Sequence, residues 1–296
     1  MLDRKKMTRR IIGPAVLGLA FGASAQSSVW EVRADGNRMY VGGTCHVLRE
    51  SDYPLPREFE TAYETSGLLV FETDLGGLND PEVQRELLQR GVYQDGTTLQ
   101  EALSAKSWKT LKRYCHSADI PPASLQALKP WMAVLTLMQL ELQRLGVDQE
   151  GVDMHFYRRA VEEGKQVGRL EPLSKQIDLL ASMGEGHEDE LVQQFVNDIA
   201  STSEMLTGLL SAWRNGDREA LQELLNRDMK RKHPELYREI IVERNRDWMD
   251  ELTAFARSPE TEFVLVGAGH LVGEKGVLHL LEKEGFRVTR LVAAEE

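Results

Sequence analysis

Two short apolar runs near opposite ends of the chain each lead into a Gly-x-x-His sequence, one ending at His46 and the other at His270. Apolar runs of this length that end in glycine turns are typical of buried strands. Residues that follow parallel strands in an α/β sheet meet in a crevice at the carboxyl edge. The two runs therefore predict an α/β fold in which N-terminal and C-terminal strands share one central sheet.

Other short segments predict further strands. Residues 29–41 form two apolar segments around an Asp-Gly-Asn turn, which predicts a hairpin. Residues 68–71 and 166–170 are expected to be short strands followed by carboxylates. Residues 262–292 have the order strand, glycine turn, helix and strand. These segments supply the predicted sheet.

Most of the remaining chain has apolar residues at helical spacing. Residues 80–129 predict several short helices, 131–145 an amphipathic helix, and 153–163 a helix that ends at a glycine. Residues 188–258 are almost continuously helical, with one break before Asp217, which can cap the next helix, and another at a proline. We expect a large helical insertion in which residues 188–258 form a hairpin or lobe.

The first 25 residues differ from the rest of the chain. Five lysines and arginines precede the apolar run 11–22, which is followed by Ala-Ser-Ala. This run is too short to cross a bilayer core of about 30 Å, but it suffices for a cleavable secretory signal. We expect a signal peptide over 1–25, an α/β domain over 26–296, and a periplasmic or secreted protein that does not stay inserted in a membrane. An uncleaved anchor is the alternative.

The composition is that of an ordinary folded protein, with 42% hydrophobic and 28% charged residues among 296. The net charge of −11 disfavours nucleic acid as a partner. The spacing of Cys45 and Cys115 does not show whether they pair. The sequence does not indicate an oligomeric state. It contains no His-Glu-x-x-His helix, Gly-x-Ser-x-Gly elbow or phosphate-binding glycine loop.

Two of the four Gly-x-x-His sequences are candidate site elements, because only those ending at His46 and His270 directly follow a strand-like run. The glycines permit tight turns that direct a side chain into a cleft. Glu72 and Glu171 each follow a predicted strand. Imidazoles and carboxylates together can bind a metal ion or act as a general base with its orienting partner. For the two glutamates, the alternative is an exposed carboxylate that closes a strand.

Arg244 lies four residues before Trp248 in a predicted helix, so both side chains project from one face. An arginine beside an aromatic ring can clamp a substrate carboxylate or an oxyanion. The alternative is a helix with surface salt bridges and a core tryptophan.

Seven short segments occur in a characteristic order and spacing. They are Gly43-Thr44-Cys45-His46, Phe71-Glu72, Leu128-Lys129-Pro130-Trp131, Gly151-Val152-Asp153, Leu170-Glu171 with Gln176, Glu243-Arg244-Asn245, and Gly267-Ala268-Gly269-His270. The pattern covers nearly the whole chain after residue 26 and resembles the TraB/GumN family. The resemblance implies an α/β fold with helical insertions, related to the erythromycin-esterase and ChaN-like proteins.

The resemblance also implies a site made of His46, Glu72, Arg244 and His270, with Glu171 as an additional carboxylate. The animal Tiki members of the family are metal-dependent proteases. By resemblance, we expect an exported peptidase in which the two histidines and the two glutamates hold a divalent ion, manganese or cobalt in preference to zinc. Arg244 would steady developing negative charge.

Three alternatives remain open at this point. The esterase relatives suggest a metal-free hydrolase of small esters with a histidine general base. The pheromone-shutdown members suggest a protein that sequesters a peptide without cleaving it. A nucleophilic Cys45 is the third. Convergence of His46, Glu72 and His270 on one point would favour an enzyme over a binding protein.

Overall fold

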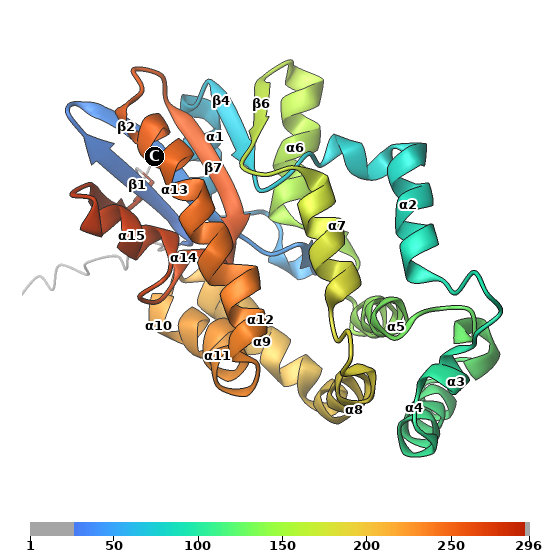
Figure 1. Ribbon diagram of the computed structural model, residues 1–296. Coiled ribbons are helices and arrows are strands. Elements are labelled where there is room, and N and C mark those ends of the chain that lie inside the picture. Colours follow the sequence, from blue (N-terminus) through green and yellow to red (C-terminus); the bar gives the residue numbers. More distant parts are fainter. Residues whose placement is uncertain (1–26, 294–296) are drawn as a thin grey trace, which may run out of the picture.

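The computed structural model describes residues 27–293, so the predicted signal peptide at 1–25 lies outside the described residues. Within them, the central element is a six-stranded mixed sheet with the order β6-β4-β7-β2-β1-β8 (Figure 1). Its strands are β1 (Val29–Ala34), β2 (Asn37–Thr44), β4 (Leu68–Phe71), β6 (Gln166–Arg169), β7 (Glu262–Gly267) and β8 (Arg287–Arg290). The predicted α/β class with a central sheet is confirmed.

Strand β7 lies at the centre and pairs in parallel with β2 on one side and with β4 on the other. Residues Glu262 to Val266 are all buried, as expected for a strand that is covered on both faces. Strand β1 pairs with β2 through a turn at Asp35 and Gly36, whose φ angles of 52° and 88° are positive. The N-terminal and C-terminal strands therefore share one sheet, as the sequence predicts.

Helices cover both faces of this sheet (Figure 1). On one face lie α13 (Arg244–Arg257) and α15 (Val277–Lys283), and on the other lie α1 (Arg57–Thr65) and α6 (Val152–Glu163). Phe59 of α1 and Phe156 of α6 pack against Phe263 of β7, with ring centroids 6.3 and 6.0 Å from it. This apolar packing fixes α6, whose first turn contributes to the site described below.

A second group of helices has a hydrophobic cluster of its own, which includes Leu99, Leu111, Leu137 and Val192. Its members are α3 (Leu99–Ala102), α4 (Ala105–Ser117), η3 (Pro122–Leu125), α5 (Pro130–Arg144) and α8 (Glu188–Asp198). None of the buried residues of this cluster belongs to the cluster around the sheet. Helices α2 (Pro81–Gly91) and α7 (Leu173–Ser182) lie between this group and the sheet in Figure 1.

The helical stretch predicted over 188–258 does not form a single lobe, so that expectation is wrong. Helix α8 joins the second group, whereas Trp213 and Trp248 from later helices are buried in the cluster around the sheet. The later helices and helical turns are η4 (Ile199–Ser201), α9 (Thr202–Arg214), α10 (Arg218–Leu221), η5 (Gln222–Arg227), α11 (Asp228–Lys232), α12 (Pro234–Tyr237) and η6 (Arg238–Glu243). Helical spacing shows which face is apolar, but not which partner will cover it.

Three further observations concern short helical turns, the two cysteines and the length of the helices. Two helical turns, η1 (Glu50–Asp52) and η2 (Gly76–Asn79), follow the short strand β3 (Val47–Leu48) and β4, respectively. Cys45 and Cys115 are both free thiols. Within residues 27–293, no helix combines the length and the apolar character that a membrane span requires.

Asp217 caps α10 as predicted, because its Oδ1 accepts hydrogen bonds from the backbone N–H groups of Glu219 and Ala220 at 3.1 and 3.0 Å. We expect Asp217→Ala to lower the free energy of unfolding by about 1 kcal/mol, since these N–H groups lose their partner. Urea unfolding followed by circular dichroism measures the change. Asp217→Asn should keep most of the stability, and an equal loss in both variants would contradict the capping role.

Candidate active site

His46 is placed by a tight contact between two turns. It follows β2 and precedes β3 (Val47–Leu48), which pairs with β5 (Gln149–Glu150). The backbone N–H of Val152 donates to the carbonyl of Cys45 at 3.1 Å. A Cβ atom on Gly151 would lie only 2.3 Å from the carbonyl carbon of His46, so the approach requires glycine. This contact brings the first turn of α6 against His46.

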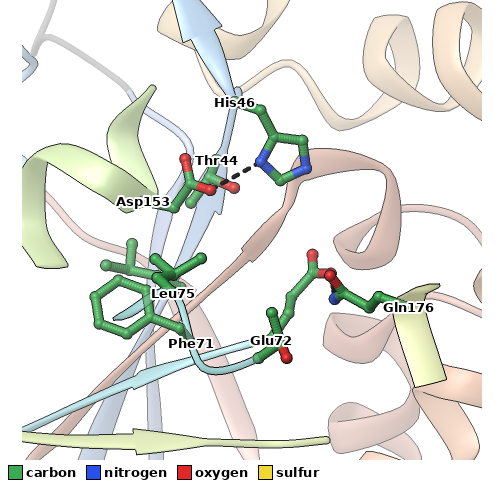
Figure 2. Close-up of a pocket in the computed structure, with 9 residues that line it drawn as sticks. Thr44, His46, Phe71, Glu72, Leu75, Asp153 and Gln176 are labelled. Atoms are coloured by element: carbon green, nitrogen blue, oxygen red, sulfur yellow. Dashed lines mark hydrogen bonds and ion pairs between the residues drawn. The ribbon is translucent and has the colours of Figure 1, made fainter. Parts of the chain in front are cut away.

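Asp153, in that first turn, is the partner of His46. Its Oδ2 lies 2.9 Å from Nδ1 of the imidazole (Figure 2). This hydrogen bond raises the pKa of His46 to about 9. The imidazole side chain is 68% exposed and that of Asp153 16%. The carboxylate thus holds the proton on Nδ1, and Nε2 is the nitrogen that can exchange a proton with a substrate or water.

Arg244 is the centre of a buried ionic cluster. It begins α13 directly after the π-helical turn η6, a type of turn that often redirects a functional side chain. Its guanidinium donates to Glu72, to Glu171 at 2.7 and 2.9 Å, and to Nε2 of His270 at 3.0 Å. Trp248 donates from its indole nitrogen to Glu171 at 3.2 Å. The guanidinium of Arg244 also lies over the indole ring in a cation–π contact. The N–H groups of Arg244 are therefore directed at protein acceptors.

His270 is held as a neutral imidazole. The side-chain nitrogen of Asn245 donates to the backbone carbonyls of His270 and Lys275 at 3.0 and 2.8 Å, which leaves its oxygen to accept from Nδ1 of His270 at 2.6 Å. The lone pair on Nε2 then accepts from Arg244. Burial lowers the pKa of His270 to about 4. This residue lies in α14 (Ala268–Leu271) and cannot act as a cation at neutral pH.

Glu72 follows β4 and stays ionised. Burial alone would raise its pKa, but the neighbouring cationic groups and the N–H of Gly267 outweigh burial and lower the pKa to about 2. The Gly267 N–H donates to Oε1 at 2.6 Å. Gln176 of α7, which lies beside Glu72 in Figure 2, donates to both Glu72 and Glu171 at 3.2 Å and so fixes the two carboxylates relative to each other.

The structure brings the five predicted site residues together at the carboxyl edge of the sheet. A Cβ atom on Gly267 would lie 3.2 Å from Oε1 of Glu72, 3.7 Å from Cδ2 of His270 and 4.0 Å from Nε2 of His46. Arg244 binds both Glu72 and Glu171 and so joins these two residues to the same cluster. The absence of a side chain at Gly267 thus leaves a small space on which both Gly-x-x-His turns converge.

The donors around this space do not fit a divalent ion as they are arranged. Within residues 27–293, no group of three or more His, Cys, Asp or Glu side chains is placed to hold a metal. The donor atoms are suitable by type, but Arg244 takes the lone pairs of Glu72, Glu171 and His270 that a metal would need. The guanidinium therefore contacts three of the four predicted ligands, and the fourth, His46, is bonded to Asp153.

Cys45 does not have the environment of a nucleophile. Burial and the carboxylates of Asp153 and Asp52 raise the pKa of its thiol to about 12. Reactive cysteines instead lie near cations that lower their pKa. At neutral pH the side chain is a thiol.

Sequence reasoning assigned no role to three residues that orient the site: Asp153, Asn245 and Gln176. Each one lies in a segment that carries the family resemblance. The available indications were their positions: Asp153 is two residues after Gly151, Asn245 directly follows Arg244, and Gln176 is five residues after Glu171. Each of them bonds at least one residue that is distant in sequence, and 107 positions separate His46 from Asp153.

A model of the TraB/PrgY/gumN family matches residues 28–290, so this chain belongs to that family. The protein YbaP of Escherichia coli, described as uncharacterized, is 23% identical over 257 residues, which are 85% of this chain and 90% of YbaP. Metalloprotease TIKI2 of Danio rerio is 24% identical over 301 residues, covering 84% of this chain and 57% of the relative. A metalloprotease TIKI homolog of Amphimedon queenslandica is 32% identical over 88 residues, 29% of this chain and 15% of that protein. No solved structure matches the chain significantly.

We expect Arg244→Gln to lower the free energy of unfolding by about 3–5 kcal/mol, because it leaves the buried carboxylates of Glu72 and Glu171 without their cation. Urea unfolding measures the loss. Arg246 is exposed on the same helix, and Arg246→Gln should change stability by no more than about 0.5 kcal/mol. Similar losses in both variants would show that Arg244 is not the centre of the cluster.

Asp153→Asn should lower the pKa of His46 from about 9 toward the ordinary value of about 6.5, because the imidazolium loses its anionic acceptor. NMR titration of the His46 ring protons measures this without any substrate. The pKa of His46 is expected to fall because its protonated form is favoured only while the carboxylate is present. An unchanged pKa would rule out Asp153 as the controlling group.

Proposed function

We propose that this protein is a hydrolase that cleaves peptide bonds, with His46 as its general base. The observation that carries the proposal is the pair formed by His46 and Asp153, in which the carboxylate binds Nδ1 and leaves Nε2 beside the space at Gly267. A histidine held by a carboxylate is a common arrangement for proton transfer in hydrolases. The peptide substrate is inferred from the relatives that are named metalloproteases.

The proposed reaction uses the neutral form of His46. Its Nε2 takes a proton from water while the water oxygen adds to the carbonyl carbon of the substrate. The resulting imidazolium is stabilised by Asp153 and then gives its proton to the leaving amine nitrogen as the C–N bond breaks. Because the pKa of His46 is about 9, the reactive neutral form increases as pH rises from 7 to 9.

Arg244 has a positioning role in this proposal. Its donors are engaged by Glu72, Glu171 and His270, so it fixes the positions of the two carboxylates instead of binding the substrate.

A metal-dependent peptidase is the second candidate. It is supported by the two relatives that are named metalloproteases. It is also supported by the donor types of His46, Glu72, His270 and Glu171, which suit manganese or cobalt and also zinc. It requires a different arrangement of Arg244 from the one described. A small ester remains an alternative substrate for the metal-free form.

Two further proposals concern location and ancestry of the fold. We propose that residues 1–25 direct export to the periplasm or the outside of the cell, which is supported by the basic and apolar pattern of that segment.

We also propose that the fold is related to the erythromycin-esterase and ChaN-like proteins. The shared feature would be a mixed sheet whose carboxyl edge carries the histidines and glutamates.

The test is turnover of a peptide library by the purified protein after removal of metals with a chelator, and again with manganese, cobalt or zinc added. We expect turnover to survive chelation, to increase between pH 7 and 9, and to fall by about 10²–10⁴-fold in His46→Gln. His187→Gln is the matched control, because His187 also ends a Gly-x-x-His sequence but its side chain is 78% exposed outside the site.

Each alternative result of this experiment would identify a different function. Turnover that is lost on chelation and restored by manganese or cobalt would establish the metal-dependent peptidase. Cleavage of small esters but not peptides would establish the esterase. Tight peptide binding without turnover would identify a sequestering protein and reject the hydrolase.

A further inference from the structure

Helix α4 has an exposed face that is strongly basic. Lys106, Lys109 and Arg113 follow one another at spacings of three and four residues, which places them on one side of the helix, and Lys112 lies beside them. All four residues are exposed, and the helix contains no aspartate or glutamate. This basic face of α4 contrasts with the net charge of −11 of the whole chain.

Ion pairs within residues 27–293 do not neutralise the basic face, since none of its four side chains takes part in one. Asp189 of α8 lies near the start of the helix, where it accepts hydrogen bonds from the backbone N–H and the hydroxyl of Ser104 at 3.0 Å. Arg159 of α6, in contrast, is held by Glu60 and Glu163. Like charges at helical spacing destabilise a helix, so an anionic partner outside this chain would relieve the repulsion.

The opposite side of α4 is fixed within the protein. Leu111 and Cys115 are fully buried in the hydrophobic cluster of the second group of helices, and Gln193 of α8 donates to the hydroxyl of Ser107 at 2.7 Å. In Figure 1, α4 lies at the edge of the molecule, away from the sheet. The basic face is therefore directed outward, and a partner on it is bound through charge instead of apolar contact.

The basic face fits an extended anionic surface better than a small ligand. Three of its four cations are lysines, which act as point charges, whereas a specific site for one carboxylate or phosphate favours the bidentate guanidinium of arginine. From Lys106 to Arg113 the cations span about 10 Å along the helix axis. Clusters of about four to eight basic residues on one helix are typical of proteins that bind anionic lipid headgroups.

We propose that the basic face of α4 binds the surface of a membrane that contains anionic phospholipids. The contact is peripheral, because the apolar side of α4 is buried in the protein. Each lysine or arginine near such a surface strengthens binding about fivefold. The Debye length is about 8 Å at physiological ionic strength, so acidic residues farther from α4 oppose the contact only weakly. This inference does not depend on the proposed reaction.

The test is co-sedimentation with vesicles of phosphatidylcholine and phosphatidylglycerol, compared with vesicles of phosphatidylcholine alone. We expect the wild type to bind only the anionic vesicles, and Lys109→Gln combined with Arg113→Gln to weaken this binding about 25-fold. Raising the salt concentration from about 0.1 to 1 M shortens the Debye length from about 10 to 3 Å and should release the wild type.

The matched control is Arg246→Gln combined with Lys283→Gln, which removes the same charge from exposed positions of α13 and α15 and should leave binding nearly unchanged. All proteins are purified in the form to which the producing cells process the chain, so any contribution of residues 1–25 is the same in every variant. Circular dichroism checks that both double variants keep the helical content of the wild type.

Three results would overturn the inference. Equal weakening in both double variants would show that net charge, and not α4, governs binding. Absence of binding to the anionic vesicles at about 0.1 M salt, or equal binding to phosphatidylcholine alone, would remove the anionic membrane as the partner. Retention on immobilised polyglutamate without any binding to vesicles would assign the basic face to an acidic protein instead.

Discussion

The guanidinium of Arg244 joins parts of the chain that are far apart in sequence. It binds carboxylates that follow β4 and β6, and it also donates to His270 in the turn after β7. Without this cation, two largely buried carboxylates would be left without a compensating charge. The arrangement of three strand ends therefore depends on one buried charge, which the π-helical turn η6 places at the start of α13.

The two Gly-x-x-His turns are alike in sequence but opposite in electrostatics. His46 is exposed beside the carboxylate of Asp153, which raises its pKa, whereas His270 is buried beside Arg244 and its pKa is lowered. The first ring can exchange protons with a substrate at accessible pH. The second serves as a fixed hydrogen-bond acceptor within the ionic cluster. The residues around each imidazole, and not the Gly-x-x-His sequence itself, determine these two roles.

Much of the sheet and of the site could be predicted, because the relevant patterns are local. Short apolar runs ending at Thr44, Phe71 and Gly267 indicated parallel strands, and parallel strand ends bring the following residues to one edge. The division of the helices into two groups could not be predicted. The periodicity of α8 does not reveal that its apolar face packs on α4 and α5 instead of continuing with α9.

By itself, the sequence determined the α/β class, the meeting of both chain ends in one sheet, the family, and the five residues that gather at its carboxyl edge. Only the tertiary structure decided which lone pairs in that cluster are free. Asp153 takes one nitrogen of His46, and Arg244 takes the acceptors of Glu72, Glu171 and His270. The physical reason is that proton location and ligand availability depend on contacts of about 3 Å between residues distant in sequence, and no local pattern encodes these contacts.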